Sequence, residues 1–108
     1  MIVEFKETSL KELYETGRTK AKEYKVLARD VRFVEKYVTV IDSFKSAKNI
    51  DDIANQGKLN YEKLKHGLSG LSSVRIIYSR IERLIFQEEG DKITVTMLKI
   101  DKTHYGQK

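Results

Sequence analysis

The sequence contains no cysteine and no proline, and each absence narrows what the chain can be. Without cysteine it can form neither a disulfide framework nor a metal site built on thiolates. Without proline, the ends of helices and strands have to be marked by glycine, asparagine and capping side chains. No apolar run approaches the roughly 18 residues that a membrane span requires, so we expect a cytoplasmic protein with no membrane contact.

Histidine is also scarce, which argues against metal chemistry. His66 and His104 lie far apart, and neither has a second histidine at ligand spacing. The acidic clusters at 51–52 and 88–91 suit a helix N-terminus and a solvated hairpin turn. The segment 67–70 lacks the lysine and the spacing of a phosphate-binding loop, and no glycine-flanked serine could form a nucleophile elbow. We therefore expect chemistry that uses no metal and no cofactor.

What is present is a basic chain of the size of one domain. Of its 108 residues, 40% are hydrophobic, which is enough for one small core. Lysine and arginine number 21 against 16 acidic residues, giving a formal net charge of +5. A basic balance favours polyanionic partners, of which nucleic acid is the commonest. Many small proteins are mildly basic without such a partner. Whether this chain binds nucleic acid therefore has to be judged from the positions of its cations.

Hydrophobic periodicity in the first half predicts one strand and two main helices. The segment Ile2–Lys6 alternates in polarity, as a strand does. Ser9–Glu12 has the pattern of a capping box and Gly17 that of a helix stop, so a short helix is expected between them. Apolar residues at spacings of three and four then predict a long amphipathic helix from about Thr19 to about Lys48.

The second half is rich in β-branched and aromatic residues, which favour strands. Asn49 is expected to cap a short helical turn that ends at Gly57, before a strand at Leu59–Leu64. The whole chain, 1–108, is expected to form a single α+β domain, with the N-terminal strand and the two main helices packed on one face of a mostly antiparallel sheet. Three further strands separated by short turns would form a meander in that sheet: Val74–Tyr78, Arg83–Gln87 and Ile93–Leu98.

Cations gather on or beside these predicted strands. Alternation places Arg75 on the face opposite to Val74 and Ile76. An arginine within an apolar strand is costly unless its guanidinium reaches water or an anion. One such arginine is often structural and pairs with a carboxylate such as Glu82, whereas several on neighbouring strands indicate a phosphate-facing patch. The candidate patch consists of Lys63, Lys65, Arg75, Arg80 and Arg83.

Three further side chains could carry acid–base or stacking roles. His104 and Tyr105 follow the last predicted strand, so they form either an exposed tail or a pair held at the end of that strand. Imidazole, with an unperturbed pKa of roughly 6.5, is well suited to protonate a leaving oxygen. Tyrosine offers a flat surface for an unpaired base. Glu62 is the only carboxylate of the Leu59–Leu64 segment, and it is either a solvent-facing or ion-paired residue or a proton acceptor.

The order of these residues resembles the RelE-like toxins of bacterial toxin–antitoxin systems. The N-terminal half, with Phe5-Lys6, Leu10-Lys11, Leu13 and Gly17 before a long helix, is similar to the HigB branch of that superfamily. The second half resembles the YoeB branch through the ordered set Glu62–Gly70, Ser73–Ile76, Arg83–Phe86 and His104-Tyr105.

This resemblance implies a metal-free endoribonuclease that cuts mRNA, commonly on the ribosome, and is silenced by a cognate antitoxin, expected to be a helix-turn-helix protein. It implies Glu62 as the general base and His104 as the general acid. It assigns Arg83 to stabilising the phosphate and Tyr105 to stacking on or orienting the substrate. Lys65 and Arg75 would support Arg83 at that phosphate. Lys63 and Arg80 are expected, from the pattern of cations alone, to contact RNA phosphates as well.

Two other classes of function stay open from the sequence. A non-catalytic module of the same fold would use the same basic face to dock RNA or the ribosome without cutting. A structural subunit would instead bind a helical partner through the sheet or through the heptad-like helix.

Overall fold

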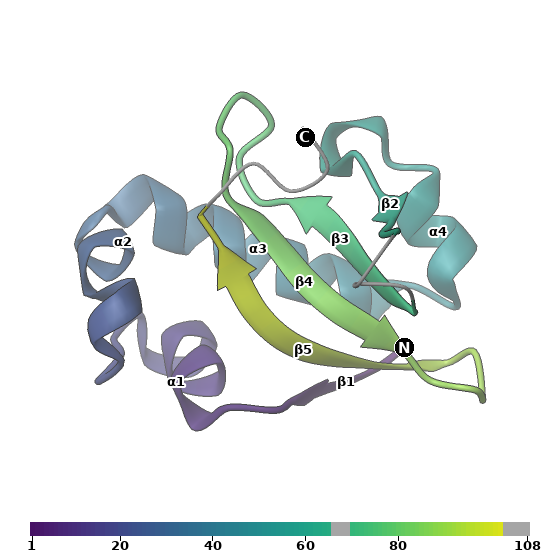
Figure 1. Ribbon diagram of the computed structural model, residues 1–108, viewed down its shortest axis with the longest axis horizontal. Helices are drawn as coiled ribbons and strands as arrows, with labels where there is room; N and C mark the ends of the chain where they lie inside the picture. Colours follow the sequence, from purple (N-terminus) through teal and green to yellow (C-terminus); the bar gives the residue numbers. More distant parts are fainter. Residues whose placement is uncertain (66–69, 103–108) are drawn as a thin grey trace.

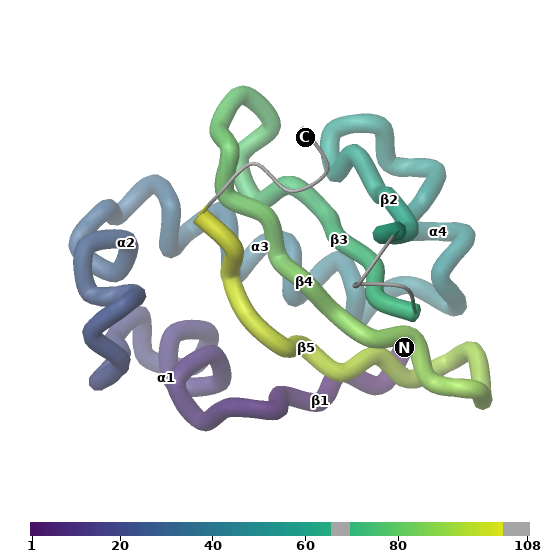
Figure 2. Tube along the Cα trace, viewed as in Figure 1, coloured from purple at the N-terminus to yellow at the C-terminus, as the bar shows by residue number. Residues whose placement is uncertain are grey.

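The chain forms a five-stranded sheet in the order β1-β5-β4-β3-β2, with helices packed behind it (Figure 1). The computed structural model describes residues 1–65 and 70–102. The three central strands are antiparallel neighbours: β3 (Leu71–Arg75), β4 (Arg83–Glu88) and β5 (Thr94–Asp101). At the edges, β2 (Glu62–Lys63) pairs antiparallel with β3, and β1 (Ile2–Phe5) pairs parallel with β5. The Cα trace shows β1 and β5, the first and last strands of the chain, side by side (Figure 2). The predicted α+β architecture is confirmed.

The first helix, α1 (Thr8–Thr16), forms where it was predicted but is capped differently. It ends at Gly17, which adopts the left-handed conformation with φ 73° and donates its backbone N–H to the carbonyl of Leu13. The predicted capping box is wrong, because the residue before the helix is Glu7 and no side chain caps it. The Ser9 hydroxyl instead contacts the Glu7 carboxylate at 3.4 Å.

The long helix predicted for 19–48 is wrong as one continuous element, because the chain breaks at Asp30. A 3₁₀ turn, Lys22–Tyr24, leads into α2 (Lys25–Arg29), and α3 (Val31–Ser46) follows. Asp30 is extended at φ −87° and ψ 100°, and its carboxylate accepts the backbone N–H of Phe33 at 3.1 Å. A side chain that caps a helix in this way starts a new one, although the apolar spacing continues across the break.

The next segments are shorter than the sequence predicted. Asn49 caps α4 (Ile50–Ala54) as expected, accepting the N–H of Asp51 at 3.0 Å, but the helix ends before Gly57. A 3₁₀ turn at Gly57–Leu59 then takes up the start of the predicted strand, so only β2 remains of it. Strand β3 lies earlier than the predicted Val74–Tyr78, because the chain already turns at Ile76 and Ile77, which are buried in the connection to β4.

The core lies between the sheet and the helices. The rings of Phe44 on α3 and Phe86 on β4 meet edge to face, with centroids 4.9 Å apart. The buried Tyr37 hydroxyl donates to the carbonyl of Leu10 at 2.8 Å, which fixes α1 against α3. No helix within the described ranges is long and apolar enough to cross a membrane. The helices of the described residues leave the opposite face of the sheet, here called the outer face, uncovered (Figure 1).

Candidate functional site

Polar and charged side chains from four adjacent strands meet on the outer face. Strand alternation directs Leu84 and Phe86 of β4 into the core, so Arg83 points to the outer face. In the sheet register Arg83 stands opposite Arg75 on β3 and opposite Asp101 on β5. Glu62 on β2 stands opposite Ser73 on β3. The register therefore gathers two arginines and two carboxylates into one region.

Arg83 is the centre of this region and is held from several sides. It is only 5% exposed. Its Nε donates to Ser73 Oγ at 2.8 Å, and its Nη2 donates to the carbonyl of Asn60 at 2.9 Å. The same Nη2 lies 3.6 Å from Glu62 Oε2. These contacts fix the plane of the guanidinium, which is the property that makes arginine a directional ligand for phosphate.

The electrostatic environment of Arg83 is mixed. Burial lowers the pKa of the Arg83 guanidinium from its ordinary value, and the neighbouring Arg75 charge lowers it further. The Glu62 and Asp101 carboxylates oppose both effects and raise it. An arginine starts so far above neutral pH that it stays charged here. The site thus holds a partly desolvated cation whose nearest counter-ion, Glu62, has a side chain that is 50% exposed.

The short strand β2 is held in place by a hydrogen-bonded group on its neighbours. The Tyr61 hydroxyl donates to the Glu88 carboxylate, and Ser72 Oγ donates to the same oxygen at 2.7 Å. Burial and the bond to Glu88 raise the pKa of Tyr61 to about 12, so it stays protonated. Asn60, just before it, is left-handed at φ 47°, a conformation that asparagine tolerates better than most residues. This arrangement sets both the Asn60 carbonyl and Glu62 beside Arg83.

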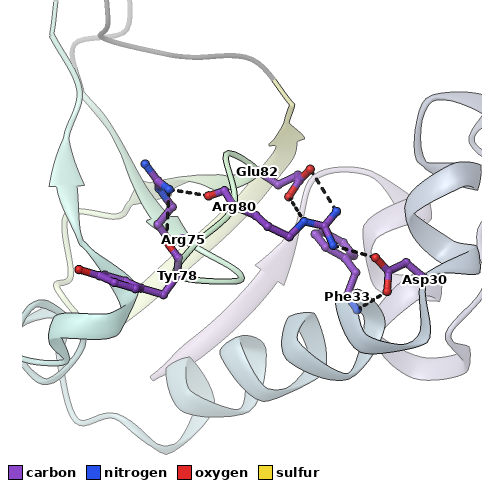
Figure 3. Close-up of polar contacts among 6 residues, drawn as sticks. All are labelled: Asp30, Phe33, Arg75, Tyr78, Arg80 and Glu82. Atoms are coloured by element: carbon purple, nitrogen blue, oxygen red, sulfur yellow. Dashed lines mark hydrogen bonds and ion pairs between the residues drawn. The ribbon is translucent and has the colours of Figure 1, made fainter.

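The other two predicted arginines play different parts (Figure 3). Arg75 donates from Nη1 to the carbonyls of Tyr78 and Arg80 in the β3–β4 turn. Its Nε is buried and has no hydrogen-bond partner in the described part of the chain. Arg80 points the other way, where its guanidinium binds Asp30 at 2.7 Å and Glu82 at 2.9 Å. Arg75 is therefore a neighbour of Arg83, whereas the Arg80 guanidinium is engaged by carboxylates elsewhere.

The predicted lysines are less closely tied to this region. Lys63 is exposed, and alternation along β2 directs it to the face opposite to Glu62. Lys65 is exposed just beyond the end of β2. Two residues that sequence reasoning missed, Lys99 and Asp101, share the outer face through their register with β4. They were missed because the last strand was expected to end at Leu98, although their alternation with the buried Ile100 carried the signal.

The predicted acid and stacking residues, His104 and Tyr105, lie outside the residues that the structure describes, as does His66. Within 1–65 and 70–102, no three acidic or histidine side chains gather as metal ligands would. The described residues therefore supply a fixed guanidinium, a second arginine beside it and a half-exposed carboxylate. Such a set can bind an anionic oxygen and accept a proton beside it.

Two solved structures of toxins have a similar fold. A YoeB/ParE toxin from Agrobacterium tumefaciens superposes with a TM-score of 0.60 over 95% of this chain and 99% of that chain, at 19% identity. The heterotetrameric YoeB-YefM toxin–antitoxin complex from Staphylococcus aureus includes a chain that superposes with a TM-score of 0.56, over 97% of this chain and 98% of that one, at 21% identity. No family model matches the sequence, and no curated protein is similar enough in sequence to match it. The expected RelE-like fold is confirmed over nearly the whole chain.

Proposed function

We propose that this chain, which has the fold of the YoeB/ParE toxins, is the toxin of a type II toxin–antitoxin system. Its activity in this proposal is endonucleolytic cleavage of mRNA, on the ribosome and in the cytoplasm, by one domain spanning 1–108. The observation that carries the enzymatic part is the Arg83–Glu62 pair. A buried, fully oriented guanidinium stands 3.6 Å from a half-exposed carboxylate, on a face that carries no helix from residues 1–65 and 70–102.

The proposed reaction uses the RNA itself as the nucleophile. The 2′-hydroxyl attacks the adjacent phosphorus, the bond to the 5′-oxygen breaks, and a 2′,3′-cyclic phosphate and a 5′-hydroxyl result. Glu62 accepts the 2′ proton and His104 donates a proton to the leaving 5′-oxygen, each transfer contributing about 10²–10⁴-fold. Tyr105 stacks on or orients the substrate. Because DNA lacks the nucleophile, it should remain intact.

Arg83 is proposed to stabilise the charge that develops on the phosphoryl oxygens, with Arg75 beside it in the register. A phosphate that approaches Arg83 competes with Glu62 for the same Nη2 atom. The competition would loosen the ion pair and leave the Glu62 carboxylate available as the base. Substrate binding and activation of the base are then one event.

Contacts to the RNA backbone are proposed for the remaining cations. Lys63 and Lys65 are exposed and close in sequence to Glu62, so they can reach neighbouring phosphates. Arg80 is the weakest of these proposed contacts, because Asp30 and Glu82 already occupy its guanidinium.

The proposed protein partner is a cognate antitoxin, expected to be a small helix-turn-helix protein. The support comes from the Staphylococcus aureus relative, whose structure is a toxin–antitoxin complex with YefM. An adjacent gene for a small helix-turn-helix protein, whose product relieves growth arrest by this chain, would support the assignment.

Brief induction of the chain followed by mapping of the 5′ ends of cellular RNA tests the proposal. New 5′-hydroxyl ends within mRNA are expected from the wild type and from Lys58→Ala, a control that removes an exposed lysine. The same ends should disappear with Arg83→Lys and with His104→Ala. Intact mRNA together with salt-sensitive RNA binding would reject cleavage and favour the non-catalytic module.

A further inference from the structure

Four of the six large, exposed hydrophobic side chains among the described residues lie close in sequence to the two members of one ion pair. The pair is Asp30–Arg80, and each of the four lies within four residues of one of its members. The other two, Ile2 and Ile93, are joined to each other by a backbone hydrogen bond of 2.7 Å. The four are Val26 (74% exposed), Val31 (71%), Tyr78 (65%) and Ile81 (39%).

The ion pair holds this region together (Figure 3). Arg80 reaches from the β3–β4 turn to Asp30, which ends α2 and caps α3, and its guanidinium lies 5.5 Å from the centre of the Phe33 ring. Exposed valines usually stand alone on a protein surface, where they need no explanation. Here Val31 directly follows Asp30 and Val26 lies one helical turn before it on α2, so both are exposed on helices that meet at a residue fixed by Arg80.

The same segment carries a surplus of exposed positive charge. Between Arg18 and Arg32 there are six basic residues against two acidic ones, Glu23 and Asp30. Asp30 is already engaged by Arg80. The six basic residues, Arg18, Lys20, Lys22, Lys25, Arg29 and Arg32, are all exposed. We call the region of Lys22, Lys25, Val26, Arg29, Val31 and Arg32 the α2 surface.

We propose that the α2 surface docks an acidic, amphipathic segment of a protein partner. The carboxylates of such a segment match the unpaired surplus of cations, and its aliphatic side chains cover Val26 and Val31. Nucleic acid fits less well, since phosphates would satisfy the cations but leave both valines in water, and a branched aliphatic side chain offers no flat face for a base. The α2 surface shares no residue with the outer-face site, so the inference holds whether or not the chain cuts RNA.

The test measures the binding of three labelled probes by fluorescence anisotropy. The first is a synthetic peptide with glutamate on one helical face and leucine at every third and fourth position. The second is polyglutamate of the same charge, and the third is single-stranded RNA of the same charge. The proposal predicts that the leucine-bearing peptide binds about tenfold more tightly than polyglutamate, because only it can bury the valines.

Two matched pairs of variants separate apolar from electrostatic contributions. Val26→Ser with Val31→Ser should weaken the leucine-bearing peptide about tenfold and leave polyglutamate unchanged. Ile2→Ser with Ile93→Ser, a pair exposed elsewhere, should change neither. Circular dichroism checks that each variant is folded. If the double serine variant does not fold, Val26→Thr with Val31→Thr replaces it.

Lys25→Glu with Arg29→Glu should weaken both peptides, whereas Lys48→Glu with Lys58→Glu, an equal charge change at other exposed positions, should not. Equal affinity for the two peptides would overturn the proposal, as would no binding of the leucine-bearing one. Undiminished binding in a folded valine variant, or RNA that binds more tightly than the peptide through Lys25 and Arg29, would also overturn it.

Discussion

Arg83 Nη2 lies 3.6 Å from Glu62 Oε2, although the strands that carry these residues are separated by β3. The guanidinium spans that distance because Ser73 on β3 accepts its Nε–H and Asn60 before β2 accepts its Nη2–H. The same arginine therefore joins three consecutive strands and forms the centre of the proposed site. Stability and proposed activity should both respond when it is changed.

Arg83→Lys should lower the free energy of unfolding by about 2 kcal/mol, because one ammonium cannot reproduce the fork that bonds Ser73 and Asn60 at once. Urea denaturation followed by circular dichroism measures the change. Arg32→Lys, an exposed control, should stay within about 0.5 kcal/mol of the wild type. A wild-type stability for Arg83→Lys would mean that the guanidinium contacts contribute nothing to the fold.

Tyr61→Phe should lower the free energy of unfolding by about 1–2 kcal/mol below pH 10, because it removes the hydrogen bond to the Glu88 carboxylate that holds β2. Folding raises the pKa of Tyr61 from 10.0 to about 12, so its contribution is complete below pH 10 and is lost as the pH rises through 12. The stability difference between wild type and Tyr61→Phe should therefore shrink across that window. Denaturation curves at a series of alkaline pH values test this, and a constant difference would contradict it.

The acid side of the stability profile should depend on the Arg80–Asp30 ion pair. The Arg80 side chain, followed by the Phe33 backbone N–H, lowers the pKa of Asp30 below its ordinary value of 3.8. The resulting stabilisation is present above pH 3.8 and is lost as the pH falls through the depressed pKa. In Arg80→Ala the pKa of Asp30, followed by NMR, should move back toward 3.8. In Lys36→Ala it should not move, and the same pKa in wild type and Arg80→Ala would show that the pair does not form.

Gly17→Ala should destabilise the fold by about 1 kcal/mol, because a residue with a Cβ is strained at the left-handed φ of 73° that ends α1. Space is not the cause, since an added Cβ would lie 3.5 Å from Val34 Cγ1, an ordinary contact. Gly90→Ala is the matched control, with no positive φ and no atom within 4 Å of the added carbon. Thermal unfolding of the two variants compares them, and equal losses would rule out a conformational cause.

Local signals in the sequence predicted much of the fold and less of the site. Gly17 and Asn49 mark helix ends because their chemistry acts on their own neighbours. The break at Asp30 was not predicted, because the apolar spacing continues across it and Arg80, which binds the capping carboxylate, lies 50 residues away in the sequence. The sequence left open that one of the arginines is structural and pairs with Glu82. Arg80 makes that pair.

Predicting the site required the register between strands, which cannot be read from the sequence. Arg75 and Arg83 were expected to be near each other because their strands were predicted as neighbours, and their register confirms it. Asp101 was missed, because its place opposite Arg83 follows only from the full length of β5. Lys63 was assigned to the same patch from its place in the sequence, and alternation along β2 directs it to the face opposite to Glu62, so its proposed contact is with a phosphate further along the RNA.

The rate of mRNA cleavage by purified wild-type and Arg83→Lys chains, measured on programmed ribosomes at a temperature where both are folded, tests the proposed site most directly. The wild type should cut, and Arg83→Lys should be slower by about 10²–10³-fold, because the ammonium cannot hold the phosphoryl oxygens in two directions. Equal rates for the two folded proteins would contradict a role for Arg83 in the reaction.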